Sequence, residues 1–86
     1  MIDNYMLYSN LPSLDLHGET RFSSIVMLRE FINNNKKLSN KLIIVIHGIG
    51  KGILKETIHK ELKNNKDVKV YKQDIFNKGV TIIELN

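Results

Sequence analysis

The chain has no cysteine among its 86 residues. This absence excludes disulfide bonds, thiol catalysis and cysteine-based zinc sites, so packing alone must hold the fold. No apolar run approaches the roughly 20 residues that cross a bilayer, and residues 1–11 lack the basic start and apolar centre of a signal peptide. We therefore expect a protein of the reducing cytoplasm with no membrane partner.

Length and charge limit the number of domains and the kinds of partner that this chain can have. Eighty-six residues are enough for one small domain with one core and too few for two. Hydrophobic residues make up 42% of the chain and charged residues 26%, which is typical of a globular protein rather than a disordered or fibrous one. The net charge of +4 permits nucleic acid, another polyanion or an anionic surface as partner, without choosing among them.

The central stretch of the chain combines a strand, a glycine-rich turn and the start of a helix. Leu42 to Ile46 is apolar and β-branched, which predicts a buried strand, and it stops at His47. Three glycines follow, and glycines before a helix start favour close approach of an anion such as phosphate. The alternative is that they only make a tight turn. The candidate phosphate-binding residues are Gly48, Gly50, Lys51, Gly52 and Lys55.

An earlier segment, residues 14–18, alternates as a strand does. Leu14 and Leu16 would face the core, while Asp15 and His17 lie on the other side, about 6–7 Å apart at their backbones. These two polar side chains could therefore act on one substrate. In the alternative interpretation Asp15 binds nearby backbone and His17 only ends the strand.

Two helices are predicted from apolar spacing. The first runs from an N-cap at Thr20 to about residue 34, although Ser23 stands where a capping box favours Glu or Gln. Residues 33–37 then form its end and a loop. The second runs from about residue 52 to residue 64, with His59 as a surface histidine. The residues expected to be buried are Phe22, Ile25, Leu28, Phe31 and Ile32 in the first helix, and Ile53, Leu54, Ile58 and Leu62 in the second.

The remaining segments complete a β-α-β-α-β-β order. Residues 68–73 and 80–85 read as strands close enough to form an antiparallel hairpin, and residues 1–13 as an N-terminal arm before a domain of residues 14–86. This order predicts an α/β fold of the α+β two-layer type with a mixed four-stranded sheet. Its first two strands should be parallel, so Asp15, His17 and His47 should meet the glycine turn at one sheet edge.

Two motifs in this order resemble the Smr (small MutS-related) domain. They are Leu-Asp-Leu-His-Gly at residues 14–18 and His-Gly-Ile-Gly-Lys-Gly-Ile-Leu-Lys at residues 47–55, and residues 79–85 resemble the closing strand of that family. The match runs from about Ser13 to the C-terminus. The resemblance implies the two-layer fold of the C-terminal domain of bacterial initiation factor three. It also implies nucleic-acid binding and, in several members, endonuclease cleavage of DNA or RNA, including messenger RNA on stalled or collided ribosomes.

By position in the motifs, the resemblance assigns functional residues. The family's Asp and His fall on Asp15 and His17, and its His-Gly-x-Gly motif falls on His47, Gly48 and Gly50. Lys55 matches the basic residue that closes the second motif. Ile49 stands where many members have a basic residue, and the neighbouring Lys51 could supply that charge.

These residues support two kinds of function. In a nuclease, His17 or His47 would take a proton from an attacking hydroxyl, Asp15 would orient the histidine, and the loop would hold the phosphate. Such an enzyme requires no cofactor, or uses a divalent ion such as Mg²⁺ or Mn²⁺ bound by Asp15 and one histidine. The alternative is a nucleic-acid-binding module without catalysis. A third interpretation, a nucleotide-binding P-loop, is disfavoured because its spacing and the Ser or Thr after its lysine are absent. DNA or RNA as target, oligomeric state and the identity of the base stay open.

Overall fold

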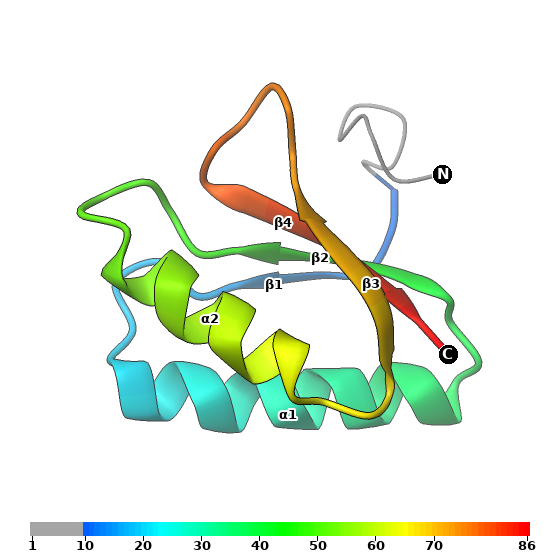
Figure 1. Cartoon of the computed structure of the whole chain (residues 1–86). Coiled ribbons are helices and arrows are strands. Elements are labelled where there is room, and N and C mark those ends of the chain that lie inside the picture. Colours follow the sequence, from blue (N-terminus) through cyan, green and yellow to red (C-terminus); the bar gives the residue numbers. More distant parts are fainter. Residues whose placement is uncertain (1–9) are drawn as a thin grey trace.

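The computed structural model describes residues 10–86 and shows a four-stranded sheet with two helices (Figure 1). The predicted order of elements is confirmed. Residues 1–9, which make up most of the predicted arm, lie outside the described part. The elements are β1 (Ser13–Asp15), α1 (Arg21–Lys37), β2 (Leu42–Ile46), α2 (Ile53–Lys63), β3 (Val68–Gln73) and β4 (Val80–Leu85).

The sheet has the strand order β1-β2-β4-β3. β1 and β2 are parallel, with Leu14 opposite Val45, and both β2·β4 and β3·β4 are antiparallel. Both helices cover the same face of the sheet, which gives two layers (Figure 1). The mixed sheet, the parallel first pair and the closing hairpin are as the sequence predicts. The carboxyl ends of β1 and β2 consequently emerge at one edge, together with the β3–β4 hairpin loop.

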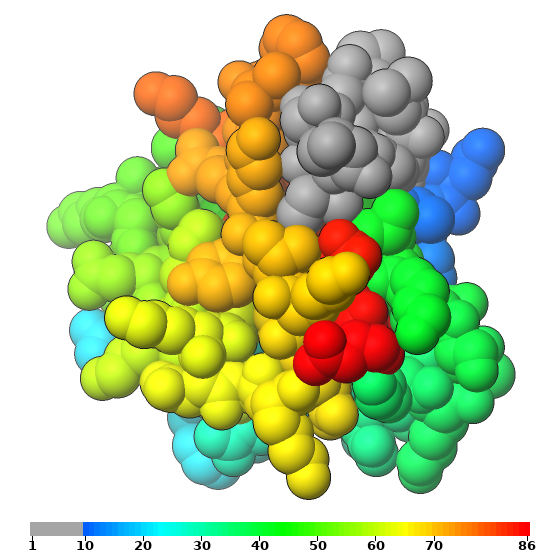
Figure 2. Space-filling model, turned by 45° about the vertical axis from the view of Figure 1, so that its right-hand side comes forward, coloured from blue at the N-terminus to red at the C-terminus, as the bar shows by residue number. Residues whose placement is uncertain are grey.

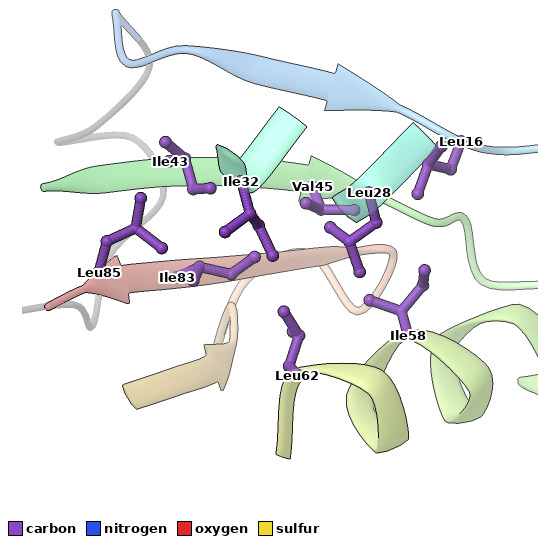
Figure 3. Packing of buried hydrophobic residues seen from close by; sticks show 9 residues of the cluster. All are labelled: Leu16, Leu28, Ile32, Ile43, Val45, Ile58, Leu62, Ile83 and Leu85. Carbon is purple, nitrogen blue, oxygen red and sulfur yellow. The ribbon is translucent and has the colours of Figure 1, made fainter. Parts of the chain in front are cut away.

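The core lies between the helices and this face of the sheet. Alternate residues of β2 and β4 point toward the helices, and apolar side chains from the middle turns of both helices fill the space between them (Figure 3). The buried cluster consists of Leu16, Leu28, Ile32, Ile43, Val45, Ile58, Leu62, Ile83 and Leu85. Because Leu16 belongs to this core, the chain on either side of it, which carries Asp15 and His17, is fixed at the sheet edge.

Three details of the helices differ from the sequence predictions. Phe22 is 79% exposed, because it precedes Leu28 by six residues and so points about 120° away from the direction of Leu28. Ile53, at the first turn of α2, is also exposed. Residues 33–37 were predicted to form the helix end and a loop, but they are helical, and α1 continues to Lys37. The reason lies at Asn35, which is buried and whose side-chain amide donates to the Phe31 carbonyl at 2.8 Å.

The start of α1 is fixed by a capping box in which serine takes the third helical position. The Thr20 Oγ1 accepts from the Ser23 amide at 3.0 Å, and the Ser23 Oγ accepts from the Thr20 amide at 3.1 Å. A serine hydroxyl therefore takes the part that Glu or Gln usually plays. This contact orders the turn between β1 and α1, which carries His17.

An ion pair links α2 to α1 at the surface. The Arg29 guanidinium donates to both carboxylate oxygens of Glu61, at 2.7 Å and 3.0 Å. This paired geometry sets the rotation of one helix against the other. None of the helices within residues 10–86 is long and apolar enough to cross a membrane.

Candidate functional site

The edge of the sheet where β1 and β2 end carries a pocket of about 460 Å³. It is lined by residues 17–19, which follow β1, and by residues 47–55, which connect β2 to the first turn of α2. The sequence prediction that the two motifs meet at one sheet edge is confirmed by this arrangement. All candidate residues except Asp15 line the pocket, and Asp15 contacts it through His17.

Asp15 and His17 form a hydrogen-bonded pair at the lip of this pocket. The His17 Nδ1 lies 2.6 Å from the Asp15 Oδ1, and the same oxygen accepts from the His17 backbone amide at 3.1 Å. A carboxylate can only accept, so Nδ1 carries the proton and Nε2 of the neutral ring is a free acceptor. The His17 side chain is 71% exposed, which leaves Nε2 open to a ligand.

This pair shifts the pKa of both members. The hydrogen bond to Asp15 and its negative charge raise the pKa of His17 above its ordinary value of 6.5. The hydrogen bonds from His17 lower the pKa of Asp15. Asp15 therefore stays a carboxylate at neutral pH, and it makes His17 a stronger base.

His47 has a different environment. It is only 3% exposed, and both ring nitrogens have partners: Nδ1 lies 2.9 Å from the Gly48 carbonyl oxygen and Nε2 lies 2.8 Å from the Thr81 hydroxyl. The carbonyl can only accept, so Nδ1 carries the proton and Nε2 accepts from Thr81. Burial lowers the pKa of His47, which keeps the ring neutral. His47 thus holds the first residue of the glycine loop.

His59 is not the surface histidine that the sequence predicts. It is half-buried, its Nε2 lies 2.7 Å from the Thr81 hydroxyl, and its ring contacts the ring of Tyr71 at a centroid distance of 5.0 Å. The hydroxyl donates to His47, so it accepts from His59. A single chain of hydrogen bonds therefore runs from His59 through Thr81 and His47 to the Gly48 carbonyl.

One feature of the sequence could have predicted this series of hydrogen bonds. Thr81 occupies the same alternating face of β4 as Ile83 and Leu85, which both belong to the core. A lone hydroxyl on a buried face needs a hydrogen-bonding partner, and a histidine on the helix packed over it is a suitable one.

The glycine loop is held by backbone contacts as well. The Gly79 carbonyl accepts from the amides of His47 and Gly48, at 2.9 Å and 3.0 Å. A Cβ at Gly79 would lie 3.2 Å from the Gly48 Cα, and a Cβ at Gly48 would lie 3.3 Å from the Cβ of His17. Gly79 was not predicted as a site residue, because this close approach joins segments more than thirty residues apart.

The positive charges of the pocket come from Lys51 and Lys55. Lys51 is exposed in the loop and Lys55 is half-buried in the first turn of α2. The N-cap of α2 is Gly52, which has no side chain to satisfy the first amides of the helix. These amides and the two lysines all favour an anion at this point.

Acid should destabilise the protein through His47, which is buried, and His59, which is half-buried. Burial lowers the pKa of His59 as it does that of His47, and the neighbouring His47 and Lys55 lower it further. Below pH 6.5 the unfolded chain therefore binds more protons than the folded one, so the free energy of unfolding falls as pH falls through this window. We expect a steeper fall between about pH 7 and about pH 5 in the wild type than in His59→Gln, measured by urea unfolding.

His59→Gln is suited to this test because its amide keeps a donor toward Thr81 and does not titrate. His17, whose raised pKa acts in the opposite direction, is present in both proteins and so cancels in the comparison. Identical pH dependence of the two proteins would contradict the assignment of His59 to the interior.

Comparison with known proteins identifies this arrangement. The sequence profile of the Smr domain matches residues 14–86. The chain belongs to the Smr family. The matched residues include all those that line the pocket.

Its relatives include much longer proteins. The chain is 33% identical over 78 residues to Endonuclease MutS2 of Caldanaerobacter subterraneus subsp. tengcongensis, a match that covers 87% of this chain and 10% of that protein. It is 32% identical over 85 residues to Endonuclease MutS2 of Clostridium kluyveri, which covers 95% of this chain and 11% of that protein. The Smr chain thus spans about a tenth of the length of the curated relatives it matches.

Two solved structures share the Smr fold. The Smr domain of Thermus thermophilus MutS2 superposes with a TM-score of 0.86 at 23% identity, covering 88% of this chain and 99% of that one. YdaL, a stand-alone small MutS-related protein from Escherichia coli, gives a TM-score of 0.81 at 20% identity, covering 86% of this chain and 63% of that one. These likenesses confirm the predicted two-layer α+β fold.

Proposed function

We propose that this Smr domain binds nucleic acid and cleaves its phosphodiester backbone at the Asp15–His17 pair. The observation that carries the proposal is the 2.6 Å contact between these side chains, which leaves the His17 Nε2 free beside the pocket. The membership of the Smr family and the name endonuclease of its MutS2 relatives support the same reaction.

The chemistry follows from the hydrogen bonds of His17. Its Nε2 takes the proton of the attacking hydroxyl, while Nδ1–H stays bonded to Asp15, which stabilises the imidazolium that forms. On RNA the attacking group is the neighbouring 2′-hydroxyl: its oxygen bonds to phosphorus, the P–O5′ bond breaks, and the leaving oxygen takes a proton from water. Lys51, Lys55 and the loop amides stabilise the charge that develops on the phosphate.

His47 is assigned a positioning role rather than that of the base. Both of its nitrogens are engaged and its ring is buried, so neither can reach a substrate without breaking a hydrogen bond. Its part is to hold the Gly48 carbonyl and with it the shape of the phosphate loop. The choice between the two histidines, which the sequence left open, thus favours His17.

A divalent ion would find few protein ligands here. Within residues 10–86 no three His, Asp or Glu side chains gather in a way that could hold a metal ion. Asp15 could contribute one carboxylate oxygen, and a hard cation such as Mg²⁺ would need its other ligands from water and the phosphate itself. Such an ion would neutralise the charge of the phosphate, and the positive charges of Lys51 and Lys55 can do the same.

Binding should depend on the two lysines of the pocket. We expect Lys51→Ala and Lys55→Ala each to weaken binding of a single-stranded RNA about three- to tenfold at low salt, and to reduce the slope of log affinity against log salt by about 0.7 per lost phosphate contact. Fluorescence anisotropy at several salt concentrations measures both quantities. Lys66→Ala is the matched control, because Lys66 lies beyond the far end of α2. Equal losses in all three variants would contradict a phosphate site at the pocket.

The cleavage reaction is tested with end-labelled single-stranded RNA, duplex DNA and branched DNA at low salt, each with EDTA or with Mg²⁺. We expect cleavage that survives EDTA. Cleavage only with Mg²⁺ would assign the reaction to a bound ion. Salt-dependent binding without cleavage of any substrate would contradict the enzyme and favour the binding module.

A further inference from the structure

The loop between β3 and β4, residues 74–79, exposes two large apolar side chains. Phe76 is 69% exposed and Ile75 is 61% exposed. Figure 1 shows this loop rising from the sheet, away from the layer of helices, and in Figure 2 it stands in orange at the top edge of the molecule. Because Leu14 and Leu16 pack toward the helices, Asp15 points to the same side of the sheet as this loop.

The loop is ordered by its own hydrogen bonds. The Asp74 Oδ2 accepts from the amides of Phe76 and Asn77, at 3.0 Å and 2.8 Å, and the Asn77 Oδ1 accepts from the Gly79 amide at 2.9 Å. These side-chain oxygens satisfy backbone amides within the loop itself, as Asp and Asn commonly do in turns. The Phe76 ring is therefore presented from a fixed backbone, which reduces the entropy lost when a ligand orders it.

The same loop is tied to the phosphate loop. The Gly79 carbonyl accepts from the amides of His47 and Gly48, and the backbones of Gly79 and Gly48 are in contact. Phe76 is only three residues from Gly79, a span of at most about 11 Å along the chain. A strand of nucleic acid whose phosphate lies at the glycine loop would thus bring a neighbouring nucleotide within reach of Phe76.

The charges of the hairpin also favour a nucleic acid. Lys78 is exposed two residues from Phe76. The only acidic residue between Lys72 and Gly79 is Asp74, which is buried and whose carboxylate accepts from backbone amides. An exposed aromatic ring beside a lysine is the combination that proteins use to stack an unpaired base while contacting its backbone.

We propose that Phe76 is a stacking platform for an unpaired base next to the phosphate bound at the glycine loop. This inference rests on the proposed function and narrows its substrate to nucleic acid with unpaired bases at that position. Bases inside a duplex have no free face for the ring, so single-stranded segments bind more tightly than duplexes of the same sequence.

Tryptophan fluorescence tests the contact directly, because the chain contains no tryptophan. Phe76→Trp places a single reporter at the loop, and Leu38→Trp places one at a similarly exposed position, the C-cap of α1, at the end of that helix far from the pocket. On titration with a single-stranded RNA of about 12 nucleotides, the emission of Phe76→Trp should be quenched, while that of Leu38→Trp stays unchanged. Equal responses of the two proteins would overturn the proposal.

Affinity provides the second measurement. Phe76→Ala should weaken binding of the single-stranded RNA about five- to hundredfold, in the range found for removing one stacking ring. The affinity of Leu38→Ala for the same RNA, and that of Phe76→Ala for duplex, should change less than about twofold. Phe76→Tyr, which keeps an aromatic ring, should bind this RNA with nearly the affinity of the wild type. Wild-type affinity of Phe76→Ala would overturn this inference and leave the proposed function standing. Absence of any nucleic-acid binding by the wild type would overturn both.

Discussion

His17→Ala is expected to reduce cleavage about 10²- to 10⁴-fold and to leave nucleic-acid affinity nearly unchanged. This loss is the usual contribution of a general base. The Asp15 carboxylate raises the pKa of His17, which makes the ring a stronger base. Affinity persists because the phosphate ligands, Lys51, Lys55 and the loop amides, are all retained. Single-turnover cleavage with protein in excess separates the chemical step from binding, which anisotropy measures on the same samples.

Asp15→Asn tests the role of the Asp15 carboxylate through the pH dependence of cleavage. In the wild type the cleavage rate should rise with pH through a midpoint above 6.5, because the base form of His17 is the active one and its pKa is raised. Asparagine removes the negative charge, so the midpoint should move down toward 6.5 and the maximal rate should fall. An unchanged midpoint in Asp15→Asn would contradict the role given to the pair.

Gly48→Ala is expected to impair both folding and cleavage. Gly48 has a φ of +82°, which L-residues other than glycine rarely adopt, so the alanine should lower the free energy of unfolding by about 1–2 kcal/mol. The added Cβ would also lie 3.3 Å from the Cβ of His17, so the histidine must shift. A shift of a few tenths of an ångström moves the base relative to the phosphate and should reduce cleavage about tenfold. Urea unfolding and single-turnover cleavage measure the two effects.

Gly18→Ala separates backbone strain from the displacement of His17. Gly18 has nearly the same φ of +81°, but a Cβ there would meet nothing within 4 Å. The two alanine variants should therefore lose similar stability, while Gly18→Ala keeps most of the cleavage activity. If both lose cleavage equally, contact between Gly48 and His17 is not what positions the base.

Local patterns were sufficient to predict the framework of the fold. The apolar run of Leu42 to Ile46 and the alternation of the last two strands predicted β2, β3 and β4, because each pattern reflects which side chains a strand must bury. The parallel pairing of β1 with β2 then brought Asp15, His17 and the glycine turn to one edge. The errors in the helices, at Phe22 and at residues 33–37, arose where a side chain's direction or an amide hydrogen bond decided the outcome.

The parts that the sequence predictions missed are contacts between segments distant in the chain. Whether His47 is a base or a buried support depends on Thr81, which lies 34 residues away and reaches both His47 and His59. The same holds for Gly79, whose importance appears only because its backbone contacts that of Gly48. Spacing along the chain shows which residues share a face of a helix or strand. The hydrogen-bonding partners of His47 and His59, by contrast, depend on how β4 packs against α2.

The most direct test of the account is chemical rescue of His17→Gly by imidazole. His17 is exposed at the mouth of a pocket of about 460 Å³, so free imidazole can occupy the place of the missing ring. We expect cleavage of single-stranded RNA by His17→Gly to be restored as imidazole is added, in proportion to its neutral form. Failure of imidazole to restore cleavage in a variant that still binds RNA, or absence of cleavage by the wild type, would contradict the assignment of His17 as the base.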